Sequence, residues 1–463
     1  MPETHYGLDP GAILEDPSDL AKYETGWRYG AGKAAAVARP STTEEVSCFL
    51  RHCFEHGIRV MPQGANTGLV GASTPDGSGS MVVLSLERLN RRLEINATDR
   101  TARVDGGVLL SRLNEALAEQ GLLFPVDLGA DPMIGAMVAT NTGGTRLLRY
   151  GDVRRNLLGA EVVLADGTVL DGMTALRKNN TGLDAKQLFT GTTGVFGVVT
   201  GAVLQVVPVP KQRVTAFVGV NDGEAVLALL SALEHVVSEL LSAFEVISAG
   251  ALEPVFRHQT RLRNPFGSGA LPSFGVLVEL STTLPSERLD LADLLEATLG
   301  THVESEAGAG VTDVLLGRPE DLWEIRHHVS ESLRGEGKVL GLDISVPRSA
   351  LPAFRESIRA WLENEHPFVR LCDFGHWGDG GVHLNLVWDE ALAPAAELVP
   401  RLQDRVYDLA VGRFQGSYSA EHGVGPHNQR FFDRFTDPSI KGLGALLKGH
   451  LDPKGLLGTT RLW

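Results

Sequence analysis

Residues 63–71 read QGANTGLVG and follow directly on the apolar run IRVMP (58–62). The apolar run predicts a strand. A loop of glycine, asparagine and threonine after a strand lets backbone N–H groups approach an anion closely. No helical pattern follows this loop, and its spacing fits neither the G-x-G-x-x-G nor the G-x-x-x-x-G-K-[ST] fingerprint. The stretch therefore indicates a phosphate cradle and argues against both a Rossmann NAD domain and a P-loop ATPase.

Two further segments share this composition, namely IGAMVATNTGG (134–144) and TGTTGVFGVVTG (190–201). A single loop of this kind is most often only a tight turn. Three such loops, each attached to a strand-like run, favour a site for a large phosphate-bearing cofactor.

The chain is too long for a single hydrophobic core. It has 463 residues, 43% of them hydrophobic, so two or three domains are expected. We expect an α+β fold with a glycine-rich domain at 1–208. In the second domain (209–415), helical segments with few glycines alternate with strand-like runs. The last segment (416–463) is too short for its own core and should pack back on the first domain.

Local patterns place several elements. Thr42 and Glu45 form a capping box, apolar residues then recur at helical spacing, and Gly57 ends the pattern, which predicts a helix. The apolar spacing between Leu109 and Gln120 is also helical. Strands are predicted at 80–86, 102–108, 274–280, 339–347 and 382–388.

Composition limits the possible partners and location. The formal net charge is −15 with a pI of about 5.4, which argues against nucleic acid or an anionic membrane as the main partner. No apolar run approaches the roughly 20 residues of a membrane span, and the N-terminal residues lack the pattern of a secretory signal. The three cysteines contain no CxxC pair. We therefore expect reduced thiols in a cytoplasmic protein, with peripheral attachment to the inner membrane as an alternative.

Residues 375–385 read GHWGDGGVHLN. The alternation in VHLNLVW predicts a strand with His383 and Asn385 on one face. His376 lies seven positions before His383, and an odd separation would put the two on opposite faces of a straight strand. They converge only if GDGG turns the chain, which glycine permits.

A third candidate ligand is Glu421 in SAEHG, with His422 beside it. Two imidazoles and one carboxylate form a common set for a divalent metal, with positions left open for substrate and water. Glu421 and His422 alone would more often form a solvated loop.

Six longer motifs span almost the whole chain: VMPQGANTGLVGAS (60–73), DLGADPMIGAMVATNTGGTRLLRYG (127–151), KNNTGLDAKQLFTGTTGVFGVVT (178–200), GHWGDGGVHLN (375–385), SAEHGVGPHNQRFF (419–432) and LDPKGLL (451–457). In these motifs the chain closely resembles the FAD-dependent D-2-hydroxy-acid dehydrogenases. That family includes D-lactate and D-2-hydroxyglutarate dehydrogenases and carries a FAD-binding domain of the vanillyl-alcohol-oxidase type.

The resemblance implies a two-subdomain FAD-binding domain at 1–208 and a substrate, or cap, domain at 209–415. The pyrophosphate would be cradled by Gly64, Ala65, Asn66, Thr67 and Gly68. Other parts of FAD would contact Pro62, Gly129, Gly135, Thr140, Asn141, Gly144, Tyr150, Gly151, Gly194 and Val199. Some relatives hold flavin covalently through a histidine near the first loop, but 63–71 contains none, so a non-covalent flavin is expected.

The resemblance also implies roles in the second half of the chain. His376, His383 and Glu421 would bind a divalent metal, with zinc as the first choice. Asn385 and His422 would lie against the substrate. The segment DLWEIRHHVSESL (321–333) resembles a helix with a carboxylate-binding arginine, Arg326, and Ser330 would share its face. Relatives often carry a lysine where this chain has Gly341, and Lys338 is the nearest substitute.

These implications combine into an expected function, the oxidation of a D-2-hydroxy acid to the 2-oxo acid by hydride transfer from C2 to flavin N5. D-2-hydroxyglutarate is the first candidate substrate, and D-lactate or D-malate is the second. The metal would polarise the C2 hydroxyl and His422 would act as general base. Reoxidation would need an electron-transfer flavoprotein or a quinone, and a homodimer is one option for the assembly.

Two rival functions leave part of the sequence unexplained. A zinc hydrolase would use His376, His383 and Glu421 but not the three glycine-rich loops. A non-catalytic flavin- or nucleotide-binding protein would use the loops but not the metal set. The chain also departs from the family pattern: Thr192-Thr193-Gly194 stands where Ser-Glu-Gly is usual, and Gly381 stands where relatives have asparagine.

Overall fold

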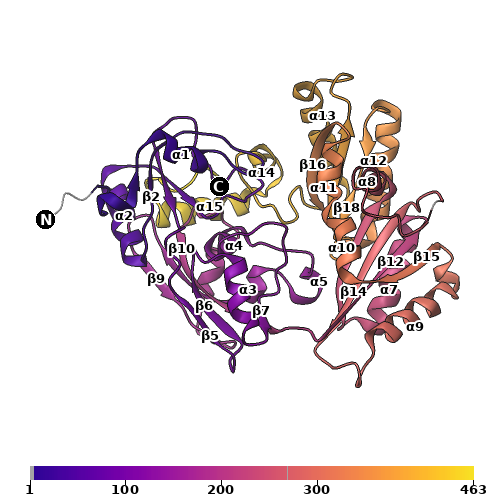
Figure 1. Cartoon of the computed structure of the whole chain (residues 1–463). Helices are drawn as coiled ribbons and strands as arrows, with labels where there is room; N and C mark the ends of the chain where they lie inside the picture. Colours follow the sequence, from indigo (N-terminus) through magenta and orange to yellow (C-terminus); the bar gives the residue numbers. More distant parts are fainter. Residues whose placement is uncertain (1–4, 268) are drawn as a thin grey trace. The chain divides into compact units, whose positions relative to one another are not determined.

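The computed structural model describes residues 5–267 and 269–463. The chain divides into two compact units (Figure 1). The first unit comprises Met1–Gly144, Gly151–Val209 and Glu421–Trp463, and the second comprises Thr145–Tyr150 and Pro210–Ala420. No helix in the described ranges is long and apolar enough to cross a membrane. Both units combine helices with sheets, and the fold class is α+β.

The first unit begins with a four-stranded sheet in the order β1-β2-β4-β3. Strands β2, β4 and β3 are parallel, and β1 is antiparallel to β2. Helix α2 packs in one apolar cluster with Val82 and Leu84, and helix α1 packs in another with Met81 and Val83. Every residue of β4 is therefore buried. The bounds are Ile13–Leu14 (β1), Pro17–Glu24 (α1), Ala34–Ala38 (β2), Thr43–His56 (α2), Val60–Gln63 (β3) and Met81–Ser85 (β4).

Helix α2 confirms the predicted capping pattern. Thr42 Oγ1 accepts a hydrogen bond from the backbone N–H of Glu45, 3.2 Å away. The carboxylate of Glu45 accepts from the N–H of Ser41 rather than from that of Thr42. Gly57 ends the helix at φ +69°, a left-handed conformation that glycine adopts without a Cβ clash.

A five-stranded antiparallel sheet, β5-β6-β10-β8-β9, forms the second layer of the first unit. Side chains of helices α3 and α4 share one apolar core with β6, β8 and β10. The bounds are Leu93–Asn96 (β5), Thr101–Asp105 (β6), Leu110–Ala118 (α3), Leu122–Leu123 (β7), Ile134–Thr140 (α4), Val153–Asn156 (α6), Leu157–Val163 (β8), Val169–Gly172 (β9), Val198–Gln205 (β10) and Val207–Pro208 (β11).

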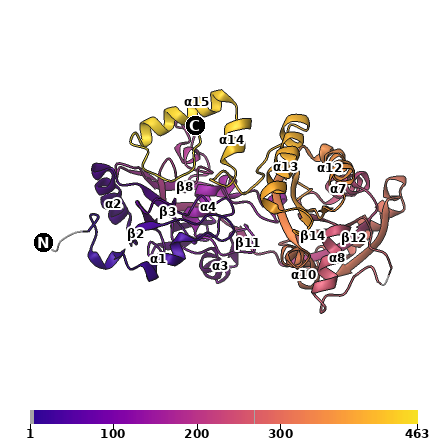
Figure 2. The same ribbon diagram turned by 90° about the horizontal axis from the view of Figure 1, so that it is seen from above.

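The C-terminal segment packs in the first unit, as the yellow helices of Figures 1 and 2 show. It contains α14 (Gln429–Phe435) and α15 (Pro438–Leu451). The buried ammonium of Lys448 donates to the carbonyl oxygen of Val195 at 2.8 Å and to Asp452 at 2.7 Å. Burial lowers the pKa of Lys448, while the Asp452 carboxylate favours its charged form. The hydrogen bond from Lys448 to Val195 O therefore ties the end of α15 to the loop before β10.

The second unit is built on an eight-stranded antiparallel sheet in the order β15-β12-β14-β13-β18-β19-β16, with β17 also paired to β19. Its strands are Gln212–Val220 (β12), Leu241–Ser248 (β13), Phe274–Thr282 (β14), Val311–Gly317 (β15), Lys338–Ser345 (β16), Arg370–Leu371 (β17), Phe374–Gly375 (β18) and Gly381–Trp388 (β19). The predicted strands at 80–86, 102–108, 274–280, 339–347 and 382–388 are confirmed within a few residues at their ends.

Helices cover the second unit's sheet. Helices α8, α10 and α11 pack on the face of the sheet that carries Phe217, Ile247 and Leu277. Helices α7 and α9 also pack on β12 and β14. The helices of this unit are Leu147–Tyr150 (α5), Gly223–Val237 (α7), Ala249–His258 (α8), Leu291–Val303 (α9), Pro319–His327 (α10), Val329–Arg334 (α11), Leu351–Glu365 (α12) and Ala395–Tyr407 (α13).

The expectation of one continuous helix over 321–333 is wrong. The chain leaves α10 at His327 and starts α11 at Val329, with His328 between them at φ −88° and ψ −2°. The ring Nδ1 of His328 lies 2.8 Å from the carbonyl oxygen of Glu324, so the side chain shares an acceptor with the helix backbone. The break allows Val329 to pack in the same core as α10.

Candidate cofactor and substrate sites

The three glycine-rich segments meet in the first unit. The N–H of Gly191 donates to Val138 O (3.1 Å) and that of Thr193 donates to Ala139 O (2.7 Å), so the third segment is bonded to α4. A Cβ on Gly64 would lie 2.7 Å from the Cβ of Ala136, so the first segment also packs against α4. Only glycine allows this approach at position 64.

The backbone of these loops is held in left-handed conformations. Asn66 (φ +57°), Asn141 (φ +51°) and Thr193 (φ +53°) adopt them without being glycine, which costs about 1 kcal/mol or more per residue and needs support from the surroundings. Asn66 has that support, because its Nδ2 donates to Thr25 O and its Oδ1 accepts from Ser73, both at 2.7 Å.

The hydroxyl of Thr193 is buried, and within the described residues its Oγ1 has no hydrogen-bond partner. Beside it, Gly194 adopts φ +78°, a conformation that favours glycine, and packs against Pro62, where a Cβ would make an ordinary contact of 3.4 Å with the proline Cβ. A close-packed backbone with an unsatisfied hydroxyl fits a loop that contacts a polar ligand.

Most of the expected cofactor residues lie in this region of the first unit. A Cβ on Gly135 would be 2.7 Å from Val199 O, so these two predicted residues are neighbours. A Cβ on Gly144 would approach Asp127 O to 2.6 Å, whereas one on Gly129 would meet nothing within 4 Å. Tyr150 belongs to the second unit and is not grouped with the others.

Thr459 and Thr460 add two buried hydroxyls that the sequence did not single out. Neither Oγ1 has a hydrogen-bond partner within the described part of the chain. They follow Gly458, where a Cβ would be 2.8 Å from the Val195 side chain.

In the second unit, the turn after β18 brings the two histidines together as predicted. The N–H groups of Asp379 and Gly381 both donate to His376 O at 3.0 Å, and Gly375 (φ +132°) and Gly380 (φ +94°) use backbone conformations that favour glycine. The rings of His376 and His383 are 5.1 Å apart between centroids.

Strand pairing adds Asp343 to this site. Asp343 on β16 is directly opposite His383 on β19, and its Oδ1 lies 4.0 Å from His383 Nδ1. Its other oxygen accepts from Ser419 Oγ at 3.3 Å. Sequence reasoning missed Asp343 because its position beside His383 depends on the register of β16 and β19. The one available signal was that Asp343 lies two residues after Gly341 in GLDIS, on the same face of the strand.

Arg326 and His376 share one buried carboxylate, that of Glu245. Arg326 Nε donates to Glu245 Oε2 at 2.5 Å, and His376 Nδ1 lies 2.5 Å from Oε1. Burial alone would raise the pKa of Glu245, but the charges of His376 and Arg326 outweigh it and lower the pKa to about 2. The Arg326 guanidinium also lies 4.6 Å from the ring centroid of Phe374.

Two predicted substrate residues, Ser330 and Lys338, do not lie with Arg326 and the two histidines. Ser330 is exposed on α11, beyond the break at His328. Lys338 lies on the opposite face of β16 from Gly341 and Asp343. Its ammonium is 3.9 Å from the carboxylate of Glu390. Asn385 is paired with Gly341 and is buried, with its Nδ2 donating to His383 O at 3.1 Å.

Glu421 and His422 are the first residues of the last segment of the first unit. They directly follow Ala420 in the chain, and Ser419 is the residue that bonds to Asp343. Nearby in the first unit, His427 stacks on Tyr29 with ring centroids 3.6 Å apart.

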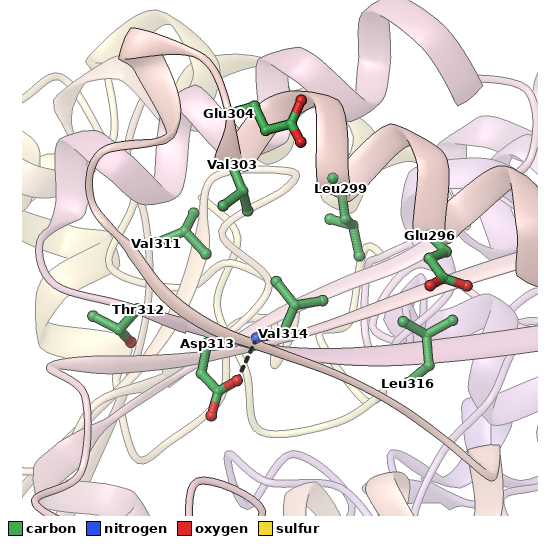
Figure 3. Close-up of a pocket in the computed structure, with 10 residues that line it drawn as sticks. Glu296, Leu299, Val303, Glu304, Val311, Thr312, Asp313, Val314 and Leu316 are labelled. Atoms are coloured by element: carbon green, nitrogen blue, oxygen red, sulfur yellow. Dashed lines mark hydrogen bonds between the residues drawn. The ribbon is translucent and has the colours of Figure 1, made fainter.

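A groove of about 380 Å³ between α9 and β15 is a different feature of the second unit (Figure 3). Leu299, Val303 and Leu316 line it, with the carboxylates of Glu296 and Glu304 beside them. None of the predicted site residues lines this groove. Its acidic groups would repel an anionic substrate.

Comparison with known proteins identifies the family of the chain. Residues 34–172 match a "FAD binding domain" and residues 209–461 match "FAD linked oxidases, C-terminal domain". The chain is 37% identical over 461 residues to the mitochondrial D-2-hydroxyglutarate dehydrogenase of Bos taurus, covering 98% of this chain and 81% of that protein. The chain belongs to the FAD-dependent D-2-hydroxy-acid dehydrogenase family. Like the rest of the family, it is a FAD-linked oxidoreductase.

Other relatives of the family differ in name. The putative mitochondrial D-lactate dehydrogenase of Schizosaccharomyces pombe is 35% identical over 97% of this chain and 85% of that protein. Among solved structures, 4-ethylphenol oxidase from Gulosibacter chungangensis matches with a TM-score of 0.70 at 19% identity, covering 96% of this chain and 93% of that one. The structural match confirms the vanillyl-alcohol-oxidase-type fold expected from the sequence.

Proposed function

We propose that this family member oxidises a D-2-hydroxy acid, with D-2-hydroxyglutarate as its first substrate, to the 2-oxo acid. The observation that carries the proposal is the placement of Arg326 and two converging histidines in one unit. An arginine can hold a substrate carboxylate while two imidazoles hold a metal. The similarity to a D-2-hydroxyglutarate dehydrogenase over 98% of the chain supports this choice of substrate.

FAD supplies the hydride acceptor, N5 of its flavin ring, in this proposal. The pyrophosphate is held by Gly64, Ala65, Asn66, Thr67 and Gly68. The remaining contacts are those expected from the family motifs: Pro62, Gly129, Gly135, Thr140, Asn141, Gly144, Tyr150, Gly151, Gly194 and Val199. The close packing at Gly64, the positive φ of Gly194 and the unsatisfied Thr193 hydroxyl support this assignment. No histidine lies in the first loop, so the flavin is non-covalent.

His376, His383 and Glu421 are the proposed ligands of a divalent metal, with zinc as the first candidate. The convergence of the two rings and the carboxylate bonded to His376 support it, because metal-binding histidines usually donate their second N–H to a carboxylate. A divalent cation held there supplies Lewis-acid polarisation of the C2 hydroxyl.

The chain's own residues carry the substrate and its proton. Arg326 binds the carboxylate, and Asn385 contributes an amide on the same strand face as His383. His422 accepts the hydroxyl proton as the C2 hydride leaves, which balances the oxidation as a transfer of one hydride and one proton. An imidazole suits this task because its pKa lies near neutral pH.

D-lactate is the second candidate substrate, because one relative is named a putative D-lactate dehydrogenase and position 341 carries no basic side chain. A panel of D- and L-2-hydroxy acids with an artificial electron acceptor separates the candidates. We expect the highest kcat/KM for D-2-hydroxyglutarate and no turnover of L-isomers. A clear preference for D-lactate would change the substrate, and no turnover of any D-2-hydroxy acid would contradict the proposed function.

The proposed electron acceptor is an electron-transfer flavoprotein or a quinone. The proposed assembly is a homodimer. Reconstituting turnover with each purified acceptor would identify which one reoxidises the flavin.

A further inference from the structure

Glu245 is a buried carboxylate on the central strand β13. Its side chain is only 1% exposed. In this strand alternate residues share a face, so Glu245 lies on the same face as Ala243 and Ile247, which pack against α8, α10 and α11. A carboxylate in such an apolar layer is costly unless every oxygen is paired.

The two oxygens of Glu245 are divided between two site residues. Oε2 accepts from the Nε–H of Arg326 and Oε1 pairs with Nδ1 of His376, both at 2.5 Å. A carboxylate has no proton to give, so Nδ1 of His376 must be the donor. In the neutral ring that a metal would bind, the lone pair is then on Nε2.

The same bond orients the arginine. Nε of Arg326 is engaged by Glu245, so the edge formed by Nη1 and Nη2 is the one that remains for a bidentate carboxylate. Phe374 lies under this guanidinium and also contacts the ring of His383, with centroids 5.3 Å apart. Arg326 and the histidine pair are therefore fixed by one carboxylate and one aromatic ring.

A second buried glutamate, Glu279 on β14, lies in the same sheet but has other hydrogen-bond partners. It is also buried, and it accepts from Arg146 Nε (3.1 Å), Ser242 Oγ (2.7 Å) and Trp323 Nε1 (2.9 Å). Within the described part of the chain, its hydrogen bonds do not include His376, His383 or Arg326. Glu279 thus provides a matched control for Glu245.

We infer that Glu245 is a positioning residue that sets the metal-binding tautomer of His376 and the orientation of Arg326 together. The inference rests on the proposed function, because it takes His376 as a metal ligand and Arg326 as the carboxylate anchor. It couples the two binding events, since neither side chain can turn without breaking its bond to the shared carboxylate.

Glu245→Gln separates this role from packing, because the amide is nearly isosteric but can accept at only one of its two ends. If the amide nitrogen faces His376, it must donate to Nδ1, and the proton moves to Nε2, which blocks metal binding. If it faces Arg326, two donors oppose each other and the arginine is displaced. The variant therefore loses metal affinity or substrate affinity.

The test measures metal binding by the metal-free protein, using Co²⁺ and Zn²⁺ titrations against a competing chelator, alongside KM for D-2-hydroxyglutarate. For Glu245→Gln we expect a loss of about 10- to 100-fold in metal affinity, or a comparable rise in KM if the arginine is displaced instead. For Glu279→Gln we expect metal affinity equal to that of the wild type. Thermal unfolding of both variants monitors the folding of each protein.

Three results would overturn the inference. The first is a folded Glu245→Gln protein with wild-type metal affinity and wild-type KM. The second is an equal loss of metal affinity in Glu279→Gln, which would make the effect a general one of buried carboxylates. The third is a wild type that binds neither metal, in which case the proposed metal site fails and the inference fails with it. Wild-type binding with no change in Glu245→Gln leaves the proposed function intact.

Discussion

At the scale of single residues, Arg326 is the side chain whose geometry matters most for the proposed binding of the substrate carboxylate. Its planar guanidinium bonds to Glu245 at Nε and stacks near Phe374. A lysine would keep the charge but cannot donate in two directions within one plane. The contribution of this residue therefore comes from geometry as well as charge.

For Arg326→Lys we expect KM for D-2-hydroxyglutarate to rise about 10-fold or more, because one or two charge-assisted hydrogen bonds are lost. The effect on kcat should be smaller. Steady-state kinetics with an artificial acceptor measures both. An unchanged KM in a folded, flavin-loaded variant would remove Arg326 from the substrate site.

Gly64 is the residue that decides whether the first loop can reach α4. In Gly64→Ala, the new Cβ would lie 2.7 Å from Ala136 Cβ, so the loop must move away. We expect a purified variant with clearly less bound flavin per chain, measured from the absorbance ratio of flavin to protein.

Gly77→Ala is the control for this substitution. Gly77 is an exposed glycine of the first unit, and a Cβ there would meet nothing within 4 Å. Its flavin content should equal that of the wild type. Full flavin content in Gly64→Ala would contradict the proposed role of the loop.

At the scale of elements, the sequence predicted well those elements whose signals are local. Helix α2 follows from a cap, an apolar period and a C-terminal glycine within 16 residues of chain, and the turn at 376–380 follows from its glycines. The break at His328 was not predictable, because helical spacing continues through it and the interruption depends on packing in the core.

The segment before α14 carries a pH-dependent contribution to stability. Burial, with smaller effects from Arg28, Arg430 and His422, lowers the pKa of His427 from 6.5 to about 4. Between these values the unfolded chain binds a proton that the folded chain does not, so stability falls as pH decreases from 6.5 to 4. Above pH 6.5 the imidazole is neutral in both the folded and the unfolded state, so this loss of stability disappears.

His427→Phe tests this contribution, since phenylalanine can still stack on Tyr29. Over the window from pH 6.5 to 4, we expect the free energy of unfolding of the variant to fall by about 2 to 3 kcal/mol less than that of the wild type. Urea titrations at several pH values measure the difference. Parallel curves for the two proteins would show that His427 titrates normally.

At the scale of the whole molecule, family motifs located the loops and the histidines, but strand pairing was needed to complete the second site. Glu245 is 131 positions from His376 in the chain, and it meets that residue only through the register of β13 and β18. Asp343 likewise depends on the pairing of β16 with β19. A buried glutamate in an apolar strand gives no sign, in one sequence, of which side chain it will bind.

The two units hold different groups in this account, with flavin in the first and the histidine pair in the second. Removing the metal with a chelator should therefore abolish most turnover while the protein keeps its flavin and its yellow colour. Adding Zn²⁺ or Co²⁺ back should restore turnover. Full activity in protein shown to be metal-free by elemental analysis would eliminate the metal from the proposal.

The most direct measurement of the central claim is the flavin spectrum of the purified protein before and after anaerobic addition of D-2-hydroxyglutarate. We predict a flavin band near its usual position that bleaches with D-2-hydroxyglutarate but not with the L-isomer. A colourless protein that cannot be loaded with FAD, or a yellow protein that no D-2-hydroxy acid bleaches, would contradict the account.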